Sequence, residues 1–357
     1  MFKWFLWSYQ VQQFNIAILG FGLSGSTFHA PLIQSIPGFK LTHVLSSQVA
    51  RIAQLYPSAK VVSDLDQILG DSTIDLVVNT LPNLEHYAVT KKCLQAGKHV
   101  VVEKPFVIDS IDGEELIELA REHGLLLSVY HNRRWDNGFL TLKQILPQLG
   151  EAYLYQAYFD RFRPAANLTK WREQGIKGSG LLYDLGSHLI DQALDLFGLP
   201  ESIYADLATQ RPSSQSIDYF QIELYYPRLR VIIGSSSVMA NSRPIVSLYG
   251  TNGSYVKHGL DPQEASLRAG LTPLDNDYAL EGLSAAGVFS EVIGDSLQNN
   301  NIVSLNGAYL EYYQLIYNSL LSGVAPPVSA ESALWVIKII EKSILSASLG
   351  QRVNLLS

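Results

Sequence analysis

The first part of the chain alternates short apolar runs with helical stretches. The apolar runs are short enough for strands, and helix-length segments that mix polar and apolar residues separate them. Strands that alternate with helices predict a parallel, doubly wound α/β sheet, in which ligands bind beyond the carboxyl ends of the strands. The candidate strands are residues 14–19, 41–45, 60–62, 74–78, 99–102 and 125–130.

From about residue 150 the pattern changes. Residues 151–163 alternate and are rich in tyrosine, and the connections between the later candidate strands are short enough for antiparallel pairing. We expect a second, α+β domain, whose sheet has one face on helices and an outer face, rich in Tyr, Ser and Ile, that is free to pair with another subunit. Its further strands are predicted at 202–208, 219–226, 230–237 and 245–248, and its closing helices at 306–321 and 329–349, with Ser329 as N-cap.

These patterns divide the chain into four parts. Residues 1–13 form an aromatic-rich extension, which we expect Trp4 and Trp7 to dock on the body. This extension has one lysine, a very short apolar core and no small-residue cleavage site, which argues against a signal peptide. The remaining parts are the α/β domain at 14–132, the α+β domain at 133–325, and a C-terminal helix at 326–357 that packs back on the body.

Composition narrows the class of partner. With 357 residues, 47% of them hydrophobic and 17% charged, the chain can bury two cores. A net charge of −7 argues against nucleic acid or an anionic membrane as the main partner and favours a small molecule. Apolar runs fall short of the roughly 20 residues that span a bilayer. The single cysteine, Cys93, excludes a disulfide framework and fits the cytoplasm.

The segment GFGLSG follows the first strand and opens a helix. Gly20 allows a tight turn, Gly22 lets the backbone approach a pyrophosphate, and Gly25 lets the helix pack on the strand. A simple glycine-rich turn would share the motif, but the order strand, turn, helix favours a dinucleotide site.

The end of the second strand indicates which dinucleotide is bound. A carboxylate there normally accepts a hydrogen bond from the 2'-hydroxyl of NAD. This chain instead has Ser46, Ser47 and Gln48, followed by Arg51. Two hydroxyls and a guanidinium suit a 2'-phosphate, so the sequence predicts NADP(H), unless Arg51 is only a surface residue of the next helix.

Polar residues also follow the fourth and fifth strands. Thr80, Pro82, Asn83 and His86 should face the ribose and nicotinamide of the cofactor, although Pro-Asn is also an ordinary helix start. Lys104 stands between Glu103 and Pro105. The proline restricts Lys104 to an extended conformation and permits a cis peptide bond between them. A lysine fixed at this edge can polarise a substrate oxygen, whereas a surface lysine would have no such role.

Residues 178–198, GSGLLYDLGSHLIDQALDLFG, have the spacing of one helix with an apolar and a polar side. Asp184 and His188 lie four residues apart on the polar side. A carboxylate one turn from an imidazole can orient the ring and raise its proton affinity, as a general base requires. A solvated helix face gives the same pattern, and a zinc site would need a third clustered ligand. Gly186 between them indicates the close approach of a substrate or a packed neighbour.

The last strand of the first domain leads into HNRRWD, residues 131–136. Donors and acceptors at a strand end suit a ligand rich in hydroxyl groups, although a salt-bridged linker would look the same. We expect substrate contacts from this cluster and from the following domain, at Asn132, Arg133, Tyr158, Arg163 and Trp171.

With GFGLSG, EKP and DLGSH together, the chain resembles the glucose-fructose oxidoreductase, inositol dehydrogenase and rhizopine-catabolism (Gfo/Idh/MocA) family over roughly residues 14–350. The resemblance implies a Rossmann dinucleotide-binding domain at 14–132 and a substrate-binding and oligomerisation domain with a large open sheet at 133–325. It also implies that Lys104, Asp184 and His188 are catalytic. His188 would take the hydroxyl proton, Asp184 would orient it, and Lys104 would stabilise the alkoxide. The residues expected at the cofactor are Gly20, Gly22, Leu23, Ser24, Gly25, Ser46, Ser47, Arg51, Thr80, Pro82, Asn83, His86, Glu103 and Lys104.

Within this family, the stretches FGLSGSTFHAPL, SVYHNRRWDNGFLTLK, DRFRP, WRE and YDLGSHLIDQ are similar to the NADP-dependent scyllo-inositol dehydrogenases. Members commonly have Ala-Thr-Pro-Asn where this chain has residues 80–83, Thr-Leu-Pro-Asn. The resemblance implies a homo-oligomeric NADP(H)-dependent dehydrogenase of a cyclic polyol, or a reductase of its ketone. Two alternatives stay open: another sugar, sugar-phosphate, bilin or aldose substrate, and a non-enzymatic NADP sensor.

Overall fold

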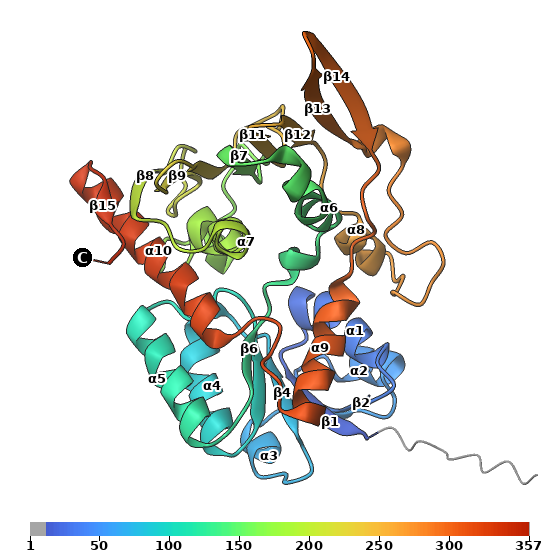
Figure 1. The fold of residues 1–357 in the computed structure, drawn as a ribbon. Helices are drawn as coiled ribbons and strands as arrows, with labels where there is room; N and C mark the ends of the chain where they lie inside the picture. The colour runs from blue at the N-terminus through green and yellow to red at the C-terminus, as the bar shows by residue number, and fades with distance from the viewer. Residues whose placement is uncertain (1–11, 357) are drawn as a thin grey trace, which may run out of the picture.

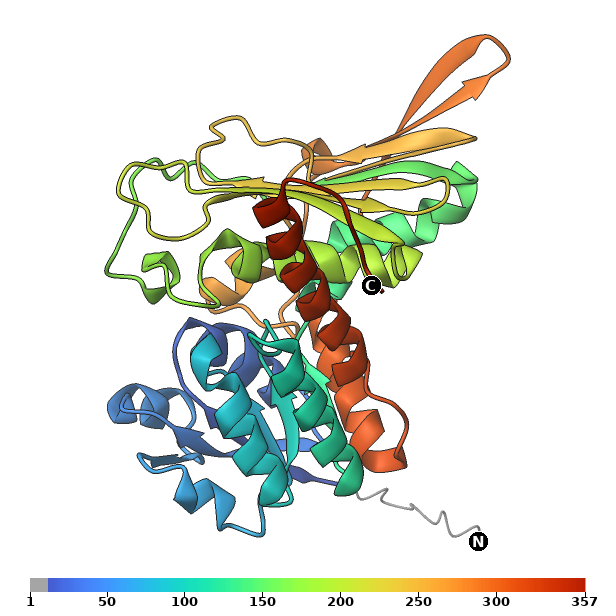
Figure 2. The same ribbon diagram turned by 90° about the vertical axis from the view of Figure 1, so that its left-hand side faces the viewer.

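The computed structural model describes residues 12–356, which form two lobes, each built on one sheet (Figures 1 and 2). The sheet of the first lobe is parallel, with the order β3-β2-β1-β4-β5-β6, and this confirms the predicted doubly wound sheet. Its strands are β1 (Phe14–Leu19), β2 (Phe39–Leu45), β3 (Lys60–Val62), β4 (Leu76–Asn79), β5 (His99–Val102) and β6 (Leu127–Val129).

Helices cover both faces of this sheet, which explains why β4 is buried at all four positions. The strand ends point toward the second lobe, so the turns that follow them lie between the lobes (Figure 2). The helical segments are η1 (Ser24–His29), α1 (Ala30–Gln34), α2 (Val49–Leu55), α3 (Asp66–Leu69), η2 (Asn83–Glu85), α4 (His86–Gln95) and α5 (Ser110–Glu122).

The second lobe holds a mixed, mostly antiparallel sheet, as predicted. In the described part of the chain it has nine strands in the order β14-β13-β12-β11-β7-β10-β9-β8-β15, and only β7 and β10 pair in parallel. The strands are β7 (Ala152–Tyr158), β8 (Ser202–Ala208), β9 (Tyr219–Tyr225), β10 (Arg230–Ser236), β11 (Val246–Gly250), β12 (Gly253–Lys257), β13 (Gly287–Ile293), β14 (Ser296–Ile302) and β15 (Val353–Asn354).

Helices of the second lobe cover one face of this sheet and reach back to the first lobe. Helix α10 contacts β8, α7 and α5, and α9 packs beside α1 (Figure 1). Ser329 caps α10 by accepting a hydrogen bond from the Ser332 amide, which confirms the predicted N-cap. The segments are η3 (Asn132–Trp135), α6 (Asn137–Ile145), η4 (Leu146–Leu149), η5 (Trp171–Glu173), η6 (Leu182–Gly186), α7 (Ser187–Phe197), α8 (Gln263–Arg268), η7 (Leu283–Ala285), α9 (Tyr309–Ser322) and α10 (Ala330–Leu349).

Two predicted elements differ from the structure. The strand expected at 151–163 ends at Tyr158, and beyond it only an isolated bridge joins Phe162 to Val238. The segment 178–198 is not one regular helix, because a π-helical turn over 182–186 precedes α7. The sequence analysis did not predict strands β12, β13, β14 and β15. The residues of β14, SLQNNNI, are almost all exposed and carry no alternation of apolar positions.

The outer face of the second sheet carries no helix (Figure 2). Along β9, Phe220, Ile222 and Leu224 are buried, while the residues between them are half-buried on the opposite face. Hairpin β13–β14 projects from one edge of the sheet. The expected docking by Trp4 and Trp7 falls outside the described residues.

Candidate active site

A cavity of about 710 Å³ lies between the carboxyl ends of the first sheet and the second lobe. It brings together residues that follow β1, β4, β5 and β6, whereas Ser46, Ser47 and Arg51 after β2 do not line it. Lysine and arginine side chains outnumber carboxylates on its walls. Of the expected site residues, Leu23, Ser24, Thr80, Asn83, His86, Glu103, Lys104, Asn132, Arg133, Arg163, Trp171, Asp184 and His188 line it.

The glycine turn at its edge has the geometry of a dinucleotide site. Gly20 has a positive φ of 91°, and a Cβ on Gly25 would stand 2.3 Å from the carbonyl oxygen of Gly20. A Cβ on Gly22 would meet nothing within 4 Å, so the backbone there is open to a ligand. Helix η1 begins directly afterwards at Ser24, and its first amides can bind a phosphate. The residues present therefore fit a dinucleotide.

Arg51 lies beside this turn. Its guanidinium donates a hydrogen bond of 3.0 Å to Gln48 Oε1 and lies 5.5 Å from the ring of Phe21. Ser46 accepts a hydrogen bond from the Gln48 amide, and Gln48 binds the Phe21 carbonyl. The end of β2 is thereby tied to the glycine turn.

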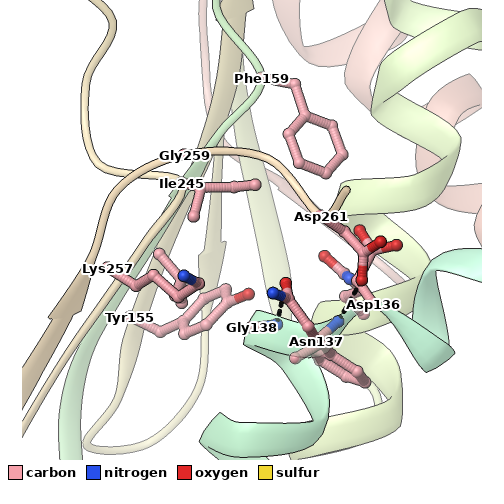
Figure 3. Close-up of a pocket in the computed structure, with 12 residues that line it drawn as sticks. Asp136, Asn137, Gly138, Tyr155, Phe159, Ile245, Lys257, Gly259 and Asp261 are labelled. Atoms are coloured by element: carbon pink, nitrogen blue, oxygen red, sulfur yellow. Dashed lines mark hydrogen bonds between the residues drawn. The ribbon is translucent and has the colours of Figure 1, made fainter. Parts of the chain in front are cut away.

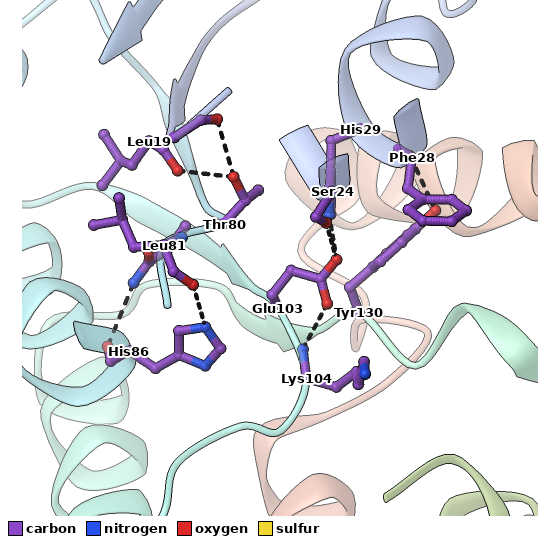
Figure 4. Close-up of polar contacts among 12 residues, drawn as sticks. Leu19, Ser24, Phe28, His29, Thr80, Leu81, His86, Glu103, Lys104 and Tyr130 are labelled. Carbon is purple, nitrogen blue, oxygen red and sulfur yellow. Dashed lines mark hydrogen bonds and ion pairs between the residues drawn. The ribbon is translucent and has the colours of Figure 1, made fainter. Parts of the chain in front are cut away.

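Glu103 joins the glycine turn to the segment that carries Lys104 (Figure 4). Its carboxylate accepts hydrogen bonds from Ser24, from His29 at 3.0 Å and from the Lys104 amide at 2.9 Å. Burial by itself would raise the pKa of Glu103, but these donors and the Lys104 charge lower it to about 2. The Glu103 carboxylate is thus occupied by protein groups.

His86 and Thr80 are held by the protein in the same way. Nε2 of His86 lies 2.9 Å from the Leu81 carbonyl (Figure 4). Nδ1 lies 2.7 Å from the Pro105 carbonyl. Thr80 Oγ1 donates to the Leu19 carbonyl at 2.9 Å. These side chains shape the cavity wall. The Lys104–Pro105 peptide bond is cis.

Lys104 and Asp184 form an ion pair in the cavity. Lys104 Nζ lies 2.9 Å from Asp184 Oδ1 and 2.8 Å from the Asp184 carbonyl oxygen. Burial tends to raise the pKa of Asp184, but Lys104 and Arg172 outweigh it and hold that pKa well below its usual range. Asp184 is therefore ionised and fixes the ammonium group in place.

His188 is buried and does not bind Asp184. Its side chain is 5% exposed, so a solvated helix face is excluded. The hydrogen bonds of residues 12–356 include none between Asp184 and His188, because the π-helical turn changes the angular spacing that four residues have in an α-helix. Burial, Lys104 and Arg133 hold the pKa of His188 well below its ordinary value. The expectation that Asp184 raises its proton affinity is wrong.

Gly186 has a structural explanation. A Cβ there would lie 3.3 Å from Leu182 and 3.5 Å from the Phe220 ring of β9. The group that approaches this glycine is therefore a packed neighbour of the second sheet.

Side chains alternate between two faces along β7 and the extended residues that follow it, and those of only one face reach the cavity. Tyr158 lies on the opposite face, where the Arg243 guanidinium stands 3.7 Å from its ring, so it does not line the cavity. Arg161 and Arg163 fall on the other face and do line the cavity. The sequence analysis named Arg163 but not Arg161. Because side chains two residues apart share a face of a strand, Arg163 within DRFRP would also have indicated Arg161. Its guanidinium forms no hydrogen bond or ion pair within the described chain, which leaves it available to a ligand.

A second, much smaller cavity lies inside the second lobe (Figure 3). Its volume of about 20 Å³ is enough for roughly one water molecule and far too small for a dinucleotide or a sugar. Asp261 accepts a hydrogen bond of 2.6 Å from the Asn137 amide at its wall, and Lys257 pairs with Glu281 at 2.8 Å. These buried groups anchor α6 to the sheet.

The fold and the large cavity define a dinucleotide-dependent oxidoreductase with a second, substrate-facing lobe. The sequence profile of the oxidoreductase family, NAD-binding Rossmann fold, matches residues 14–131, and that of the family's C-terminal alpha/beta domain matches residues 143–355. The chain belongs to the Gfo/Idh/MocA family of oxidoreductases.

Relatives cover nearly the whole chain. The chain is 40% identical to the scyllo-inositol 2-dehydrogenase (NADP(+)) IolW of Bacillus subtilis, over 95% of each protein. It is 42% identical to the uncharacterised oxidoreductase YdgJ of Escherichia coli, over 93% of this chain and 96% of that protein. The structure of the oxidoreductase yvaA from Bacillus subtilis superposes with a TM-score of 0.94 at 39% identity, covering 97% of this chain and 99% of the other. Residues 12–356 contain no helix of the length and hydropathy that a bilayer span requires.

Proposed function

We propose that this protein is an NADP(H)-dependent oxidoreductase that transfers a hydride between the nicotinamide and a cyclic polyol or its ketone, with scyllo-inositol and scyllo-inosose as the first candidates. The observation that carries the proposal is the ion pair of Lys104 and Asp184, at 2.9 Å, in a cavity that also contains His188 and borders the glycine turn. A homo-oligomer in the cytoplasm is part of the same proposal.

The residues have separate tasks in the oxidation direction. Neutral His188 takes the proton of the substrate hydroxyl through Nε2, because its Nδ1 is buried away from the cavity. Lys104 stabilises the negative charge that develops on the same oxygen, and Asp184 holds Lys104 in position. The bound cofactor supplies the hydride acceptor. Reduction of the ketone reverses these proton movements.

The preference for NADP over NAD is supported by Arg51, Ser46 and Ser47. These three residues follow β2, where a carboxylate would repel a 2'-phosphate, and Arg51 lies next to the glycine turn. The 40% identity to an NADP-dependent relative agrees with this assignment.

The substrate class is supported by the second lobe. Asn132, Arg133, Arg161, Arg163 and Trp171 line the cavity with donors that can bind several hydroxyl groups. The relative named scyllo-inositol 2-dehydrogenase makes a cyclic polyol the first class to test.

The test is a panel of inositol stereoisomers, inososes, aldoses and sugar phosphates, with NADPH consumption or NADP reduction as the readout and NAD(H) as the parallel cofactor. Turnover of an inosose or inositol with NADP(H) supports the proposal. Turnover only of aldoses or sugar phosphates assigns another reaction of the family, and NADPH binding without turnover of any member indicates a non-enzymatic sensor.

A further inference from the structure

Positive charge exceeds negative charge on the walls of the large cavity. Six arginines and two lysines line it, against four carboxylates. The protein itself binds all four carboxylates. Glu103 accepts the hydrogen bonds described above, and Asp184 pairs with Lys104. Glu173 and Glu264 accept hydrogen bonds or ion pairs from arginines. A ligand in this cavity therefore meets many donors and no carboxylate that the described residues leave unoccupied.

Three of the cations in the cavity have no counter-charge. Five have a carboxylate partner at 2.8 to 3.9 Å, namely Lys104, Arg133, Arg172, Arg211 and Arg268. The other three have no such partner among residues 12–356, namely Arg161, Arg163 and Lys170. Arg161 is also partly buried. A cation taken out of bulk water without a counter-charge costs stability, and an anionic ligand would remove that cost.

Arg161 and Arg163 extend from a backbone segment that is held in place. The Arg161 amide donates to the Ser236 carbonyl at 2.9 Å, and the Arg163 amide donates to the Ser237 carbonyl at 2.7 Å. The buried guanidinium of Arg211 donates to the Arg163 carbonyl at 3.1 Å. Side chains two residues apart on an extended segment share one face, with Cα atoms about 6.6 Å apart. The two guanidinium groups can therefore bind one ligand group together.

Arg161 lies on the substrate side of the cavity. Burial and the neighbouring arginines lower the pKa of Arg161, and Asp184 partly offsets this effect. The guanidinium nevertheless stays protonated at neutral pH. Its charge also contributes to the low pKa of His188. The pyrophosphate of the cofactor, by contrast, is expected at the glycine turn of the first lobe. The phosphates of the cofactor are therefore not the counter-charge of Arg161.

The hydrogen-bonding chemistry of the free cations indicates the kind of group that they bind. Arginine and lysine side chains only donate hydrogen bonds, whereas a hydroxyl group both donates and accepts them. A neutral polyol would need free acceptors here as well as donors. A phosphate or carboxylate group mainly accepts, and a guanidinium can bind either of them with two parallel hydrogen bonds. An anionic oxygen group therefore complements this part of the cavity.

We propose, on the basis of the proposed function, that the substrate is a cyclic polyol or ketone that carries a phosphate or carboxylate group, which Arg161 and Arg163 bind. The ring then lies between this anion site and the reaction centre at Lys104 and His188. A neutral ring leaves both guanidinium groups without a partner, so the two arginines determine substrate specificity.

The kinetic test compares each inositol with its monophosphate, and neutral cyclohexane polyols with carboxylated ones such as quinate, all with NADP(H). The anionic substrate should have a kcat/KM about 10- to 100-fold above that of the neutral one, the factor that charge-assisted hydrogen bonds supply. Arg161→Met should lower this ratio about tenfold, and Arg161→Lys should keep part of it. The phosphate and carboxylate arms show which anionic group the site prefers.

The matched control is Arg228→Met. Arg228 is an exposed arginine of the same lobe and lies outside the cavity, where it pairs with Glu151 at 3.1 Å. Its loss changes the net charge of the protein by the same amount, but the ratio of anionic to neutral kcat/KM should stay at the wild-type value. An equal fall of this ratio in Arg228→Met and Arg161→Met would show a general charge effect and overturn the anion site.

A second measurement does not depend on turnover. Inorganic phosphate is titrated by calorimetry into protein saturated with NADPH, so that the cofactor already fills its own phosphate sites. The proposal predicts that phosphate binds this complex, that its affinity falls about tenfold in Arg161→Met, and that it stays unchanged in Arg228→Met. Phosphate that binds only the protein without NADPH, or binds wild type and Arg161→Met equally, overturns the anion site.

The two proposals fail in different ways. If neutral polyols are turned over as efficiently as their anionic counterparts, the anion site is overturned and the proposed function stands. If neither kind of polyol is turned over, the proposed function fails, and the phosphate titration still decides whether Arg161 and Arg163 form an anion site.

Discussion

The ammonium of Lys104 and the carboxylate of Asp184 lie 2.9 Å apart in the wall of the cavity, although 80 residues separate them in the chain. Lys104 comes from the end of a strand of the first lobe, and Asp184 from the π-helical turn of the second. The pair therefore joins the two lobes at the proposed reaction centre.

Lys104→Met should change the pH profile as well as the rate. The positive charge of Lys104 is one cause, after burial, of the low pKa of His188. Neutral His188 is the active form, so the acid limb of kcat/KM in the wild type should lie below pH 6.5, the ordinary value. Without the ammonium the limb should move to higher pH, and kcat should fall. An acid limb that stays in place in Lys104→Met would contradict the assigned electrostatics.

His188→Asn should remove the general base. We expect kcat to fall on the order of 10²- to 10⁴-fold, the range for losing such a group, while NADPH affinity stays near that of the wild type. Steady-state kinetics and NADPH fluorescence titration measure the two effects separately. Near wild-type turnover would rule out His188 as the base.

Arg51→Ala should weaken the preference for NADP over NAD. A charge-assisted hydrogen bond to the 2'-phosphate contributes roughly 1.5 to 3 kcal/mol, or about 10- to 100-fold in affinity. The ratio of kcat/KM for NADP and NAD should fall by that factor. Ser46→Ala and Ser47→Ala are matched controls with smaller expected effects. A preference that survives Arg51→Ala would move the role to the two serines, and a wild type that prefers NAD would refute the NADP assignment.

Glu103→Gln should lower stability at neutral pH and flatten its acid dependence. The pKa of Glu103 is about 2 in the folded protein, against 4.5 for the ordinary group. Because its pKa is lower in the folded than in the unfolded state, Glu103 adds to the free energy of unfolding, on the order of 3 kcal/mol in total. This contribution is complete above pH 4.5 and is lost as the pH falls toward 2. Urea unfolding between pH 3 and 7 measures this slope. An identical slope in wild type and variant would show that Glu103 is not a source of the acid sensitivity.

Ile232→Glu should dissociate the proposed homo-oligomer. Ile232 pairs with Gln156 and Glu223 on the outer, helix-free face of the second sheet and is half-buried there. A charge at this position is costly where a second subunit covers it, whereas on a free face its cost is limited to the repulsion from Glu223 on the neighbouring strand. Light scattering should report an oligomer for the wild type and for Ile232→Val, and a monomer for Ile232→Glu. A monomeric wild type at micromolar concentration would contradict the proposal.

The amino-acid sequence by itself determined the first lobe and the edge at which the site lies. Fully buried parallel strands are continuous apolar runs, and the glycine turn leaves a local signature, so both can be recognised without long-range information. The closing helix and its Ser329 cap are local features too. Because parallel strands end at one edge, the residues after each strand, Lys104 among them, could be placed together in advance.

Only the tertiary structure decided which side chains bind one another. Asp184 and His188 are four residues apart, yet a π-helical turn and the approach of Lys104 from the other lobe give Asp184 a different partner. The structure likewise decided which face of β7 and its extension is turned to the cavity. Arg161 lines the cavity, whereas the predicted Tyr158 lies on the other face. Sequence periodicity reports the burial of a face, whereas the partner of a charged group depends on distances between segments remote in the chain, which only packing fixes.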